Sequence, residues 1–369
     1  MKPVPRVRPN LKILFLTRYG FDGASSRYRT LQFLPWLRNH GVDCTVQSFF
    51  GQGYVSKRFG GTTGFLAMLP AAYWRRIRRM VSSGAFDLIS VEKEVFPYLP
   101  GGIESGIFLK NARYTVDYDD AVYHRYDQHS NCFLRTMLAD KISRVMAGAK
   151  AVTAGSRYIL DYARQYNPNS FLVPTVIDLS LYPDAEPPMI AAHPFLIGWI
   201  GSQATVQYLK SVEDALEEFC STRNARVLVI GGNPIPLRVP SVEWVPWSRE
   251  NEVKWLSAIH VGIMPLKRNP WSMGKCAFKL IQYMACWKPV VASPVGENNR
   301  VVSHGLNGYL ADTKEEWIEA LNDLYRDSGR CREMGRAGRR MVEERYHLDA
   351  VAPLVLDILY SASGSRDRS

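Results

Sequence analysis

Two lysines four residues apart, Lys275 and Lys279, lie in an apolar stretch that also contains Cys276. If a helix begins near Gly274, both lysines share one face of it, and Gln282 follows three residues after the second lysine. Two cations at a helix start, where free backbone N–H groups attract anions, would form a clamp for a diphosphate. Single lysines on helices are usually solvated, but the apolar surroundings of this pair favour a binding role.

Small residues follow two of the predicted strands. The first strand runs into TRYGFDGASSRYR, which contains Ser26, Arg27 and Arg29, and a later strand runs into Gly201 and Ser202. Free N–H groups at a helix start and forked guanidinium donors suit a phosphate or a carboxylate. Either turn alone could be a plain strand-to-helix turn. Neither has the G-x-G-x-x-G spacing of a dinucleotide site.

The elements that would position these candidate residues are indicated by short runs of Val, Ile and Leu, which alternate with longer amphipathic segments. That pattern predicts parallel sheets wrapped by helices, an α/β fold of two Rossmann-like, doubly wound domains. The first series predicts strands at residues 12–17, 43–49, 87–91, 114–118, 151–154 and 171–173. The second series predicts strands at residues 195–200, 226–230, 242–245, 261–264, 289–292 and 308–310.

A proline-containing segment separates the two series. The predicted division is a first domain over residues 1–180, a linker over 181–194, a second domain over 195–347, a terminal helix over 348–362 able to cross back to the first domain, and a loose tail over 363–369. In open α/β sheets, ligands bind outside the carboxyl ends of the strands. We therefore expect a site in a crevice between the two sets of strand ends.

Positive charge is concentrated in the first half of the chain. Residues 1–190 hold 24 Lys and Arg against 15 Asp and Glu, and the remainder holds 22 against 20. A basic segment over residues 66–81 combines an apolar stripe with Trp74, Arg75, Arg76, Arg78 and Arg79. That profile is typical of a helix lying at an anionic membrane surface. A helix that covers a sheet and exposes a solvated basic face is the alternative, and both can hold together.

Several classes of protein are disfavoured. The six cysteines are scattered without metal-ligand spacing or a disulfide framework, which favours a reducing cytoplasm. No apolar run reaches the roughly 18 residues that span a bilayer, and no convincing signal peptide is present. The sequence also lacks H-x-x-x-H and G-x-S-x-G motifs, so a hydrolase is disfavoured.

The segment GKCAFKLIQYMACWKPVVASPVG at 274–296, followed by HGLNGYLA, resembles the donor-binding signature of the retaining glycosyltransferases of family four, the group-one class with the GT-B fold. SSRYR, DYDDAVYHRYD at 117–127, AGSRYILDYA and VPTVID are similar to the bacterial polysaccharide members of that class. The resemblance touches both halves of the chain, and its C-terminal part is the more specific.

The resemblance implies transfer of a sugar, with retention, from a UDP- or GDP-sugar to a glycan or lipid-linked acceptor in cell-surface polysaccharide synthesis. The first domain would bind the acceptor and the second the donor, at the cytoplasmic face of an anionic membrane, with no nucleic acid as partner. Lys275 and Lys279 would stabilise the departing diphosphate. The implied donor-binding residues are Gly201, Ser202, Gln282, Gly296 and Glu297. The implied acceptor-binding residues are Ser26, Arg27, Arg29 and Asp119.

One departure from the family pattern concerns two glutamates separated by seven residues. Their positions are held by Gly274 and Gln282, so neither carboxylate is present, although the Gln282 amide can still bond a ribose hydroxyl. A nucleotide-sugar 2-epimerase of the same fold, or a catalytically degenerate binding subunit, are therefore alternatives.

The DYDD segment, residues 117–120, could serve a metal or an acceptor. On a strand, Asp117 and Asp119 would share a face, which suits a divalent cation. Two-lobed transferases of the resembling kind use lysines and helix starts in place of the ion, so we expect no metal cofactor. We predict an acceptor-side role for Asp119 or Asp120, with Asp120 or His124 as one route for the acceptor's proton and the donor phosphate as the other. Bracing of a loop is the alternative for any one aspartate.

Overall fold

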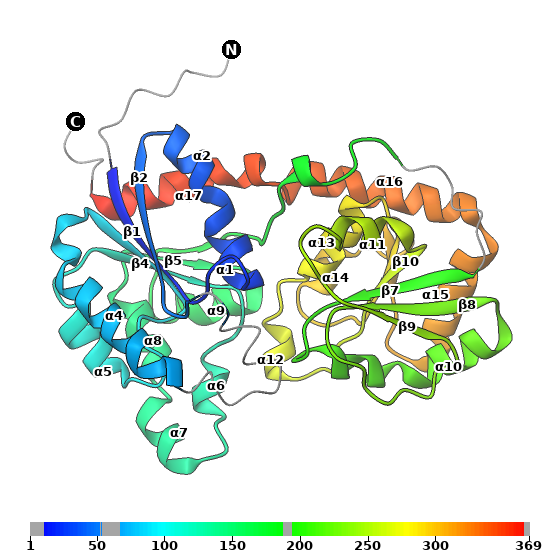
Figure 1. The fold of residues 1–369 in the computed structure, drawn as a ribbon, viewed down its shortest axis with the longest axis horizontal. Coiled ribbons are helices and arrows are strands. Elements are labelled where there is room, and N and C mark those ends of the chain that lie inside the picture. The colour runs from blue at the N-terminus through cyan, green and yellow to red at the C-terminus, as the bar shows by residue number, and fades with distance from the viewer. Residues whose placement is uncertain (1–10, 52, 54–66, 187–193, 365–369) are drawn as a thin grey trace. The chain divides into compact units, whose positions relative to one another are not determined.

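The computed structural model describes residues 11–51, 53, 67–186 and 194–364, which form two compact α/β units (Figure 1). The first unit contains the chain up to Thr175 and again from Val351 onward. The second unit runs from Val176 to Ala350. Parts of the expected linker (187–193) and tail (365–369) lie outside the described residues.

The first unit is built on a six-stranded sheet. Its strands are β1 (Leu11–Thr17), β2 (Val42–Ser48), β3 (Leu88–Glu92), β4 (Tyr114–Tyr118), β5 (Ala151–Ala154) and β6 (Ser170–Leu172). Its α-helices are α1 (Ala24–Arg29), α2 (Leu34–Asn39), α4 (Leu69–Val81), α5 (Gly101–Ile103), α6 (His124–Asp127), α7 (Cys132–Leu138), α8 (Lys141–Gly148), α9 (Arg157–Arg164) and α17 (Leu348–Ser363). Shorter 3-10 or π turns span Leu31–Phe33, Ser83–Ala85 and Glu104–Phe108.

The second unit repeats this plan. Its strands are β7 (Phe195–Ile200), β8 (Ala225–Ile230), β9 (Val242–Val245), β10 (Val261–Met264), β11 (Val290–Ala292) and β12 (Gly308–Leu310). Its α-helices are α10 (Glu213–Thr222), α11 (Glu252–Ala258), α12 (Pro270–Met273), α13 (Phe278–Ala285), α14 (Asn298–Val301), α15 (Lys314–Arg326) and α16 (Ser328–Arg345). Two 3-10 turns span Leu179–Leu181 and Val206–Ser211.

The strand order places a switch point in each sheet. The orders are β2-β1-β3-β4-β5-β6 and β12-β11-β10-β7-β8-β9, and the paired strands are parallel. Successive connections leave in opposite directions from β1 and from β7. The carboxyl ends of β1 and β3, and of β7 and β10, are therefore the expected ligand-binding edges of the two units.

The doubly wound α/β fold predicted from the sequence is confirmed. Each of the twelve predicted strands is present, and no strand end is displaced by more than one residue. These strands were predictable because parallel strands covered on both faces consist almost entirely of apolar residues. In the second unit the core forms two apolar clusters, whereas that of the first unit includes one large cluster around Val91, Val116 and Val152.

The chain passes between the units in two segments that lie side by side. Ile177 N donates to Tyr346 O at 3.0 Å, and Leu348 N donates to Ile177 O at 2.9 Å. This short parallel pairing explains why the second unit begins at Val176, a few residues before the linker expected at 181–194. The terminal helix α17 starts at Leu348, as expected, and from Val351 it belongs to the first unit.

Candidate functional site

Tyr283, in the second half of α13, fixes this helix over the switch point of the second sheet. Its hydroxyl accepts a hydrogen bond from Ile200 N at 2.9 Å and donates to Ile263 O at 3.2 Å, at the ends of β7 and β10. A side chain at Gly262 would place its Cβ 2.2 Å from the Tyr283 ring, so this close approach requires glycine. The helix carrying Lys279 is thereby held at the edge where the fold favours ligand binding.

The expectation of one helix from Gly274 onward is wrong. Helix α12 ends at Met273, α13 begins at Phe278, and Ala277 between them adopts a left-handed conformation with φ of 54°. Only Lys279 is in the first turn of α13, where its Nζ lies 5.3 Å from the centroid of the Trp199 ring. Lys275 belongs to the connection, and its Nζ lies 5.4 Å from the ring of Trp271. The lysines do not share a helical face.

The turns expected to bind the donor lie at the ends of β7 and β11. Gly201 packs against Trp199, and Ser202 beside it is exposed. Gly296 has φ of +56°, and a Cβ there would come within 2.6 Å of Met273 O. This contact brings the turn of Gly296 and the buried Glu297 against the end of α12, next to Lys275. Whether these residues bind a donor stays a prediction.

Gln282 is buried and bonded to a glutamate that the sequence analysis did not identify. Its Nε2 donates to Glu252 Oε1 at 2.8 Å. Glu252 also accepts hydrogen bonds from Trp247 Nε1 at 2.6 Å and from the Tyr182 hydroxyl at 3.4 Å. A carboxylate therefore lies one side chain behind the position where the family pattern places its second glutamate.

At the edge of the first unit, Glu92 ends β3 and braces the turn after β1. Its Oε2 accepts from Ser26 Oγ at 2.6 Å and from Arg18 N at 3.1 Å. Burial raises the pKa of the Glu92 carboxyl by more than the neighbouring Lys93 lowers it. Ser26 is fully buried in this network, so its side chain fixes the turn, and an acceptor-binding role for it would require the network to open.

Lys93 and Asp119 form the next pair along this edge. Lys93 Nζ lies 2.8 Å from Asp119 Oδ1 and 3.6 Å from Asp120 Oδ2, and Ser25 Oγ donates to the other oxygen of Asp119. Burial alone would raise the pKa of Asp119, but Lys93 and the Ser25 hydroxyl lower it to about 2. Lys93 has φ of 65°, a strained conformation for a residue with a side chain.

Two of the arginines expected to bind the acceptor are bonded within the first unit. Arg29 donates to Asp117 at 3.0 and 2.5 Å and to Val173 O at 2.7 Å. Arg27 Nη1 donates to Phe21 O at 2.9 Å. Asp117, at the end of β4, also accepts from Thr153 Oγ1 at 2.6 Å. Arg29 therefore joins α1 to the sheet, and an acceptor-binding role for it stays a prediction.

A largely buried ionic cluster supports the loop after β3. Lys141 Nζ lies 2.7 Å from Glu104 and 3.2 Å from Glu94, and Arg18 Nη1 lies 2.8 Å from Glu94. Although burial by itself raises it, Lys141 and Arg18 hold the pKa of Glu94 below its ordinary value. This cluster was not predicted from the sequence. The run Glu92-Lys93-Glu94 directly after a buried strand was the available signal.

His124 lies in α6 with both ring nitrogens in contact with neighbours. Nδ1 lies 3.1 Å from both carboxylate oxygens of Asp127, and Nε2 lies 2.9 Å from the Tyr158 hydroxyl. A proton-accepting role for His124 would require one of these contacts to open.

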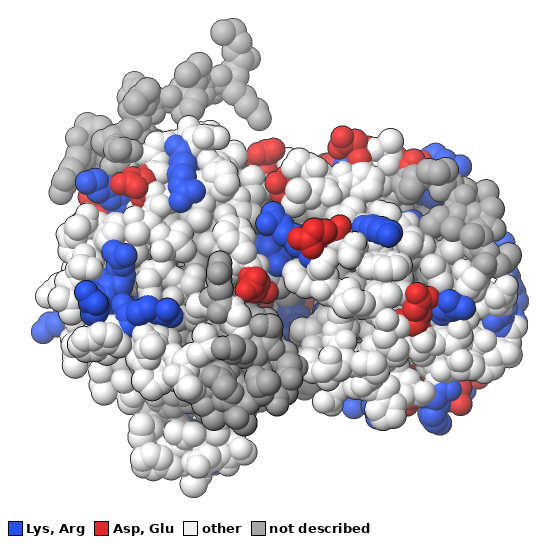
Figure 2. Space-filling model, in the orientation of Figure 1, with Lys and Arg blue, Asp and Glu red and all other residues white. Residues whose placement is uncertain are grey.

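The expectation that Arg76 faces a membrane is wrong. Arg76 is 0% exposed, and its Nη2 donates to Thr17 O at 2.8 Å and Gln47 O at 3.2 Å. Because helix α4 packs this residue against the sheet, burial lowers the pKa of Arg76 to about 9. Arg75 and Arg78 are exposed, Arg79 is half-buried and Trp74 is 63% exposed. Figure 2 shows basic side chains gathered over α4 without acidic ones beside them.

The remaining part of the expected basic helix, Leu66, lies outside the described residues. No helix within the described ranges is long and apolar enough to cross a bilayer. The same residues contain no cluster of His, Cys, Asp and Glu that could hold a metal ion.

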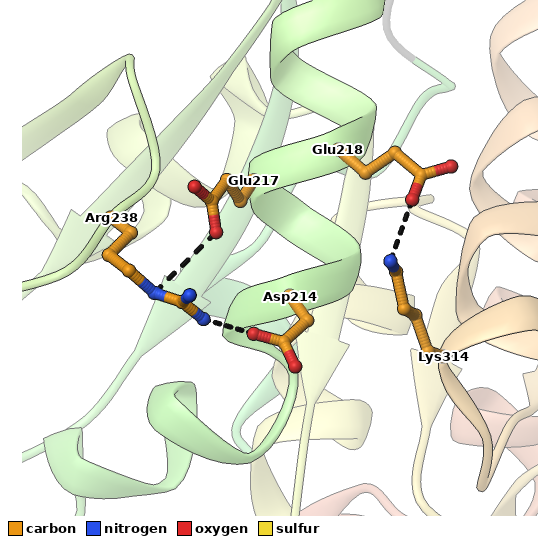
Figure 3. A pocket seen from close by; sticks show the side chains of 5 residues that line it. All are labelled: Asp214, Glu217, Glu218, Arg238 and Lys314. Carbon is orange, nitrogen blue, oxygen red and sulfur yellow. Dashed lines mark hydrogen bonds and ion pairs between the residues drawn. The ribbon is translucent and has the colours of Figure 1, made fainter.

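The second unit also has an open pocket on the flank formed by α10 and the start of α15. It is lined by Asp214, Glu217, Glu218, Arg238 and Lys314 (Figure 3). Lys314 pairs with Glu218 at 2.7 Å, and Arg238 contacts Glu217 at 3.5 Å and also Asp214. These charges neutralise one another on the flank formed by α10 and the start of α15, so the pocket is a solvated ion-pair network.

Comparison with known proteins identifies the class of the second unit. Residues 194–327 match the family model described as "Glycosyl transferases group 1". Residues 194–327 of the second unit are therefore similar to the group 1 glycosyltransferases, and the two six-stranded sheets match the GT-B fold.

Two curated relatives are similar over part of the chain. A D-inositol 3-phosphate glycosyltransferase of Xylanimonas cellulosilytica is 32% identical over 123 residues, covering 33% of this chain and 28% of the relative. An alpha-maltose-1-phosphate synthase of Mycolicibacterium smegmatis is 29% identical over 186 residues, covering 47% and 43%. The aligned part thus spans less than half of the length of either relative.

Among solved structures, Anabaena Alr3699/HepE in complex with UDP-glucose aligns over 95% of this chain and 100% of its own, with a TM-score of 0.71 and 16% identity. At that identity the likeness establishes the fold.

Proposed function

We propose that this protein is a retaining glycosyltransferase that moves a sugar from a nucleotide diphosphate donor to a glycan or lipid-linked acceptor in cell-surface polysaccharide synthesis. The observation that carries the proposal is Lys279 in the first turn of α13, held by Tyr283 at the switch point of the group 1 domain. The UDP-glucose bound by the Anabaena protein of the same fold supports a nucleotide-sugar donor.

The chemistry follows from where charge develops. As the anomeric C–O bond to the diphosphate breaks and the bond to the acceptor oxygen forms, negative charge grows on the departing phosphate. Lys279, the backbone N–H groups at the start of α13 and Lys275 on the preceding connection would stabilise that charge. These cations take the place of a divalent metal, so we propose that transfer requires none.

The acceptor's proton would pass to an oxygen of the departing phosphate. His124 would first have to leave Asp127 or Tyr158, and Asp120 Oδ2 already lies 3.6 Å from the ammonium group of Lys93. The proton therefore stays within the donor and acceptor pair, on the side of the sugar from which the diphosphate leaves.

The acceptor would be met at the cytoplasmic surface of an anionic membrane. The exposed Trp74, Arg75 and Arg78 of α4, with the half-buried Arg79, combine an aromatic side chain suited to headgroup depth with positive charge. This proposal keeps the membrane helix expected from the sequence and removes Arg76 from it.

Release of nucleoside diphosphate from UDP- and GDP-linked hexoses, with and without a lipid-linked acceptor, tests the proposal. We expect turnover that survives excess EDTA and a product of retained configuration. Loss of turnover on chelation, restored by magnesium or manganese, would overturn the metal-free mechanism. Nucleotide binding without any turnover would favour the degenerate binding subunit, and a 2-epimerised sugar without transfer would favour the epimerase.

A further inference from the structure

Glu252 joins three separate segments of the second unit from a buried position. It is the first residue of α11 and is 6% exposed. Its oxygens accept hydrogen bonds from Trp247 in the loop after β9, Tyr182 near the start of the unit and Gln282 in α13. A buried carboxylate with three donors aimed at it is held in one orientation.

A carboxylate next to an amide decides which way the amide points. Ionised Glu252 can only accept hydrogen bonds, so Gln282 must turn its NH₂ group toward it. The carbonyl oxygen Oε1 of Gln282 then points away from Glu252, and it accepts no hydrogen bond from any residue that the structure describes. Because Gln282 lies three residues after Lys279 on α13, this acceptor is a neighbour of the proposed phosphate-stabilising lysine.

An acceptor oxygen cannot bond the oxygens of a diphosphate, but it can bond a hydroxyl group. In a nucleotide sugar, the hydroxyls of the ribose are close to the diphosphate. We propose that Glu252 is a positioning residue that fixes the amide of Gln282 so that its carbonyl oxygen accepts a ribose hydroxyl of the donor. This inference rests on the proposed function, because it requires a nucleoside diphosphate in the second unit.

Two single variants and their combination isolate the effect of the carboxylate. In Glu252→Gln, two amides face each other and either orientation of Gln282 is satisfied, so the acceptor is no longer fixed. In Gln282→Glu, two carboxylates meet and repel. The double variant Glu252→Gln with Gln282→Glu restores one carboxylate and one amide in exchanged positions, with an acceptor again facing the ligand.

Isothermal titration with UDP, GDP and their 2′-deoxy and 3′-deoxy forms provides the measurement. In the unaltered protein, we expect loss of the recognised hydroxyl to weaken binding about tenfold, as for one hydrogen bond to a buried acceptor. Glu252→Gln should reduce that ratio to about two or three while unmodified nucleotide still binds, and the double variant should return it to about tenfold. Glu243→Gln, at a half-buried glutamate of β9 that pairs with Arg226, is the matched control and should leave the ratio unchanged.

The outcomes separate the two hypotheses. If the unaltered protein binds neither UDP nor GDP, the proposed function fails and this inference fails with it. If a nucleotide binds but Glu252→Gln keeps the tenfold ratio, or the double variant does not restore it, Glu252 only stabilises the fold and the positioning role is wrong. Thermal melting of each variant checks folding, and the double variant keeps the test decisive should Glu252→Gln fold poorly.

Discussion

The two units bury charge in opposite ways. In the first unit, Lys141 with Glu94 and Glu104, Arg18 with Glu94 and Arg29 with Asp117 form ion pairs in which no side chain is more than 15% exposed. In the second unit, the ion pairs of Lys314 with Glu218, Arg238 with Asp214 and Arg226 with Glu243 lie at the surface, and each includes a side chain at least 43% exposed.

This difference indicates which contacts hold the residues at the ligand-binding edge of each sheet. In the first unit, cations and carboxylates at the strand ends compensate one another and hold loops in fixed and partly strained conformations, as at Lys93. In the second unit, aromatic rings such as Trp199 and a tyrosine bonded to the backbone hold the helix that carries Lys279. Buried ion pairs thus hold the first edge, whereas aromatic contacts and a tyrosine bonded to the backbone hold the helix at the second edge.

Breaking the buried cluster should have the largest effect. Lys141→Met leaves Glu104 buried without its cation and Glu94 paired with Arg18 alone, and we expect a loss of about 3–5 kcal/mol in the free energy of unfolding. The matched variant Lys314→Met removes the exposed pair with Glu218 and should leave the urea midpoint unchanged. Equal midpoints for the two variants in urea unfolding would contradict the comparison between the units.

Removing the cation at α13 should affect catalysis and leave the fold intact. We expect Lys279→Ala to lower the transferase rate about a hundredfold or more, as for loss of one charge-stabilising donor. Steady-state rates at saturating donor, with circular dichroism as a check, measure this effect. Lys254→Ala on α11, an exposed lysine beside Trp255, is the control. An unchanged rate would remove Lys279 from the site.

Vesicle binding should distinguish the two units, with a smaller effect than that expected for Lys279→Ala. The triple variant Arg75→Gln, Arg78→Gln and Arg79→Gln should weaken binding to anionic vesicles about thirtyfold, since the two exposed arginines each contribute about 1 kcal/mol near the surface. Added salt should have the same effect. The exposed arginines of α16 provide the matched triple variant, at Arg332, Arg336 and Arg340. If the two triple variants show the same decrease in vesicle binding, α4 has no specific role in membrane binding.

The smallest expected effect is on stability and concerns Tyr118 in the first unit. Its hydroxyl is buried and has no hydrogen-bond partner within the described ranges, and burial raises the pKa of Tyr118 well above its ordinary value. A tyrosine with a raised folded pKa contributes stability that is complete below about pH 10 and is lost as the pH rises further. We therefore expect Tyr118→Phe to stabilise by about 1 kcal/mol at pH 7 and to weaken the alkaline loss of stability.

Chemical unfolding at pH 8 and pH 10.5 measures the Tyr118 effect. In the second unit, Tyr283→Phe should instead destabilise the protein, because its hydroxyl makes two hydrogen bonds. A destabilised Tyr118→Phe would indicate that this hydroxyl is hydrogen-bonded in solution.

The strands were predictable because their apolar character is local, whereas the site depends on contacts between distant residues. The helix start was misplaced because Ala277, a residue without any turn preference, adopts a left-handed conformation between α12 and α13. The RRIRR pattern of α4 does not reveal which arginine faces the sheet. The bond between Glu252 and Gln282 joins residues thirty positions apart, and no spacing rule links them.

The return of α17 to the first unit has a consequence for synthesis on the ribosome. Residues 11–175 are made first, yet the surface that covers Val351, Ala352 and Tyr360 stays open until the last helix has been translated. The second unit, made later, contains all of its elements by Ala350. Translation therefore completes the later unit before the earlier one, and the nascent first unit exposes an apolar face to chaperones during that interval.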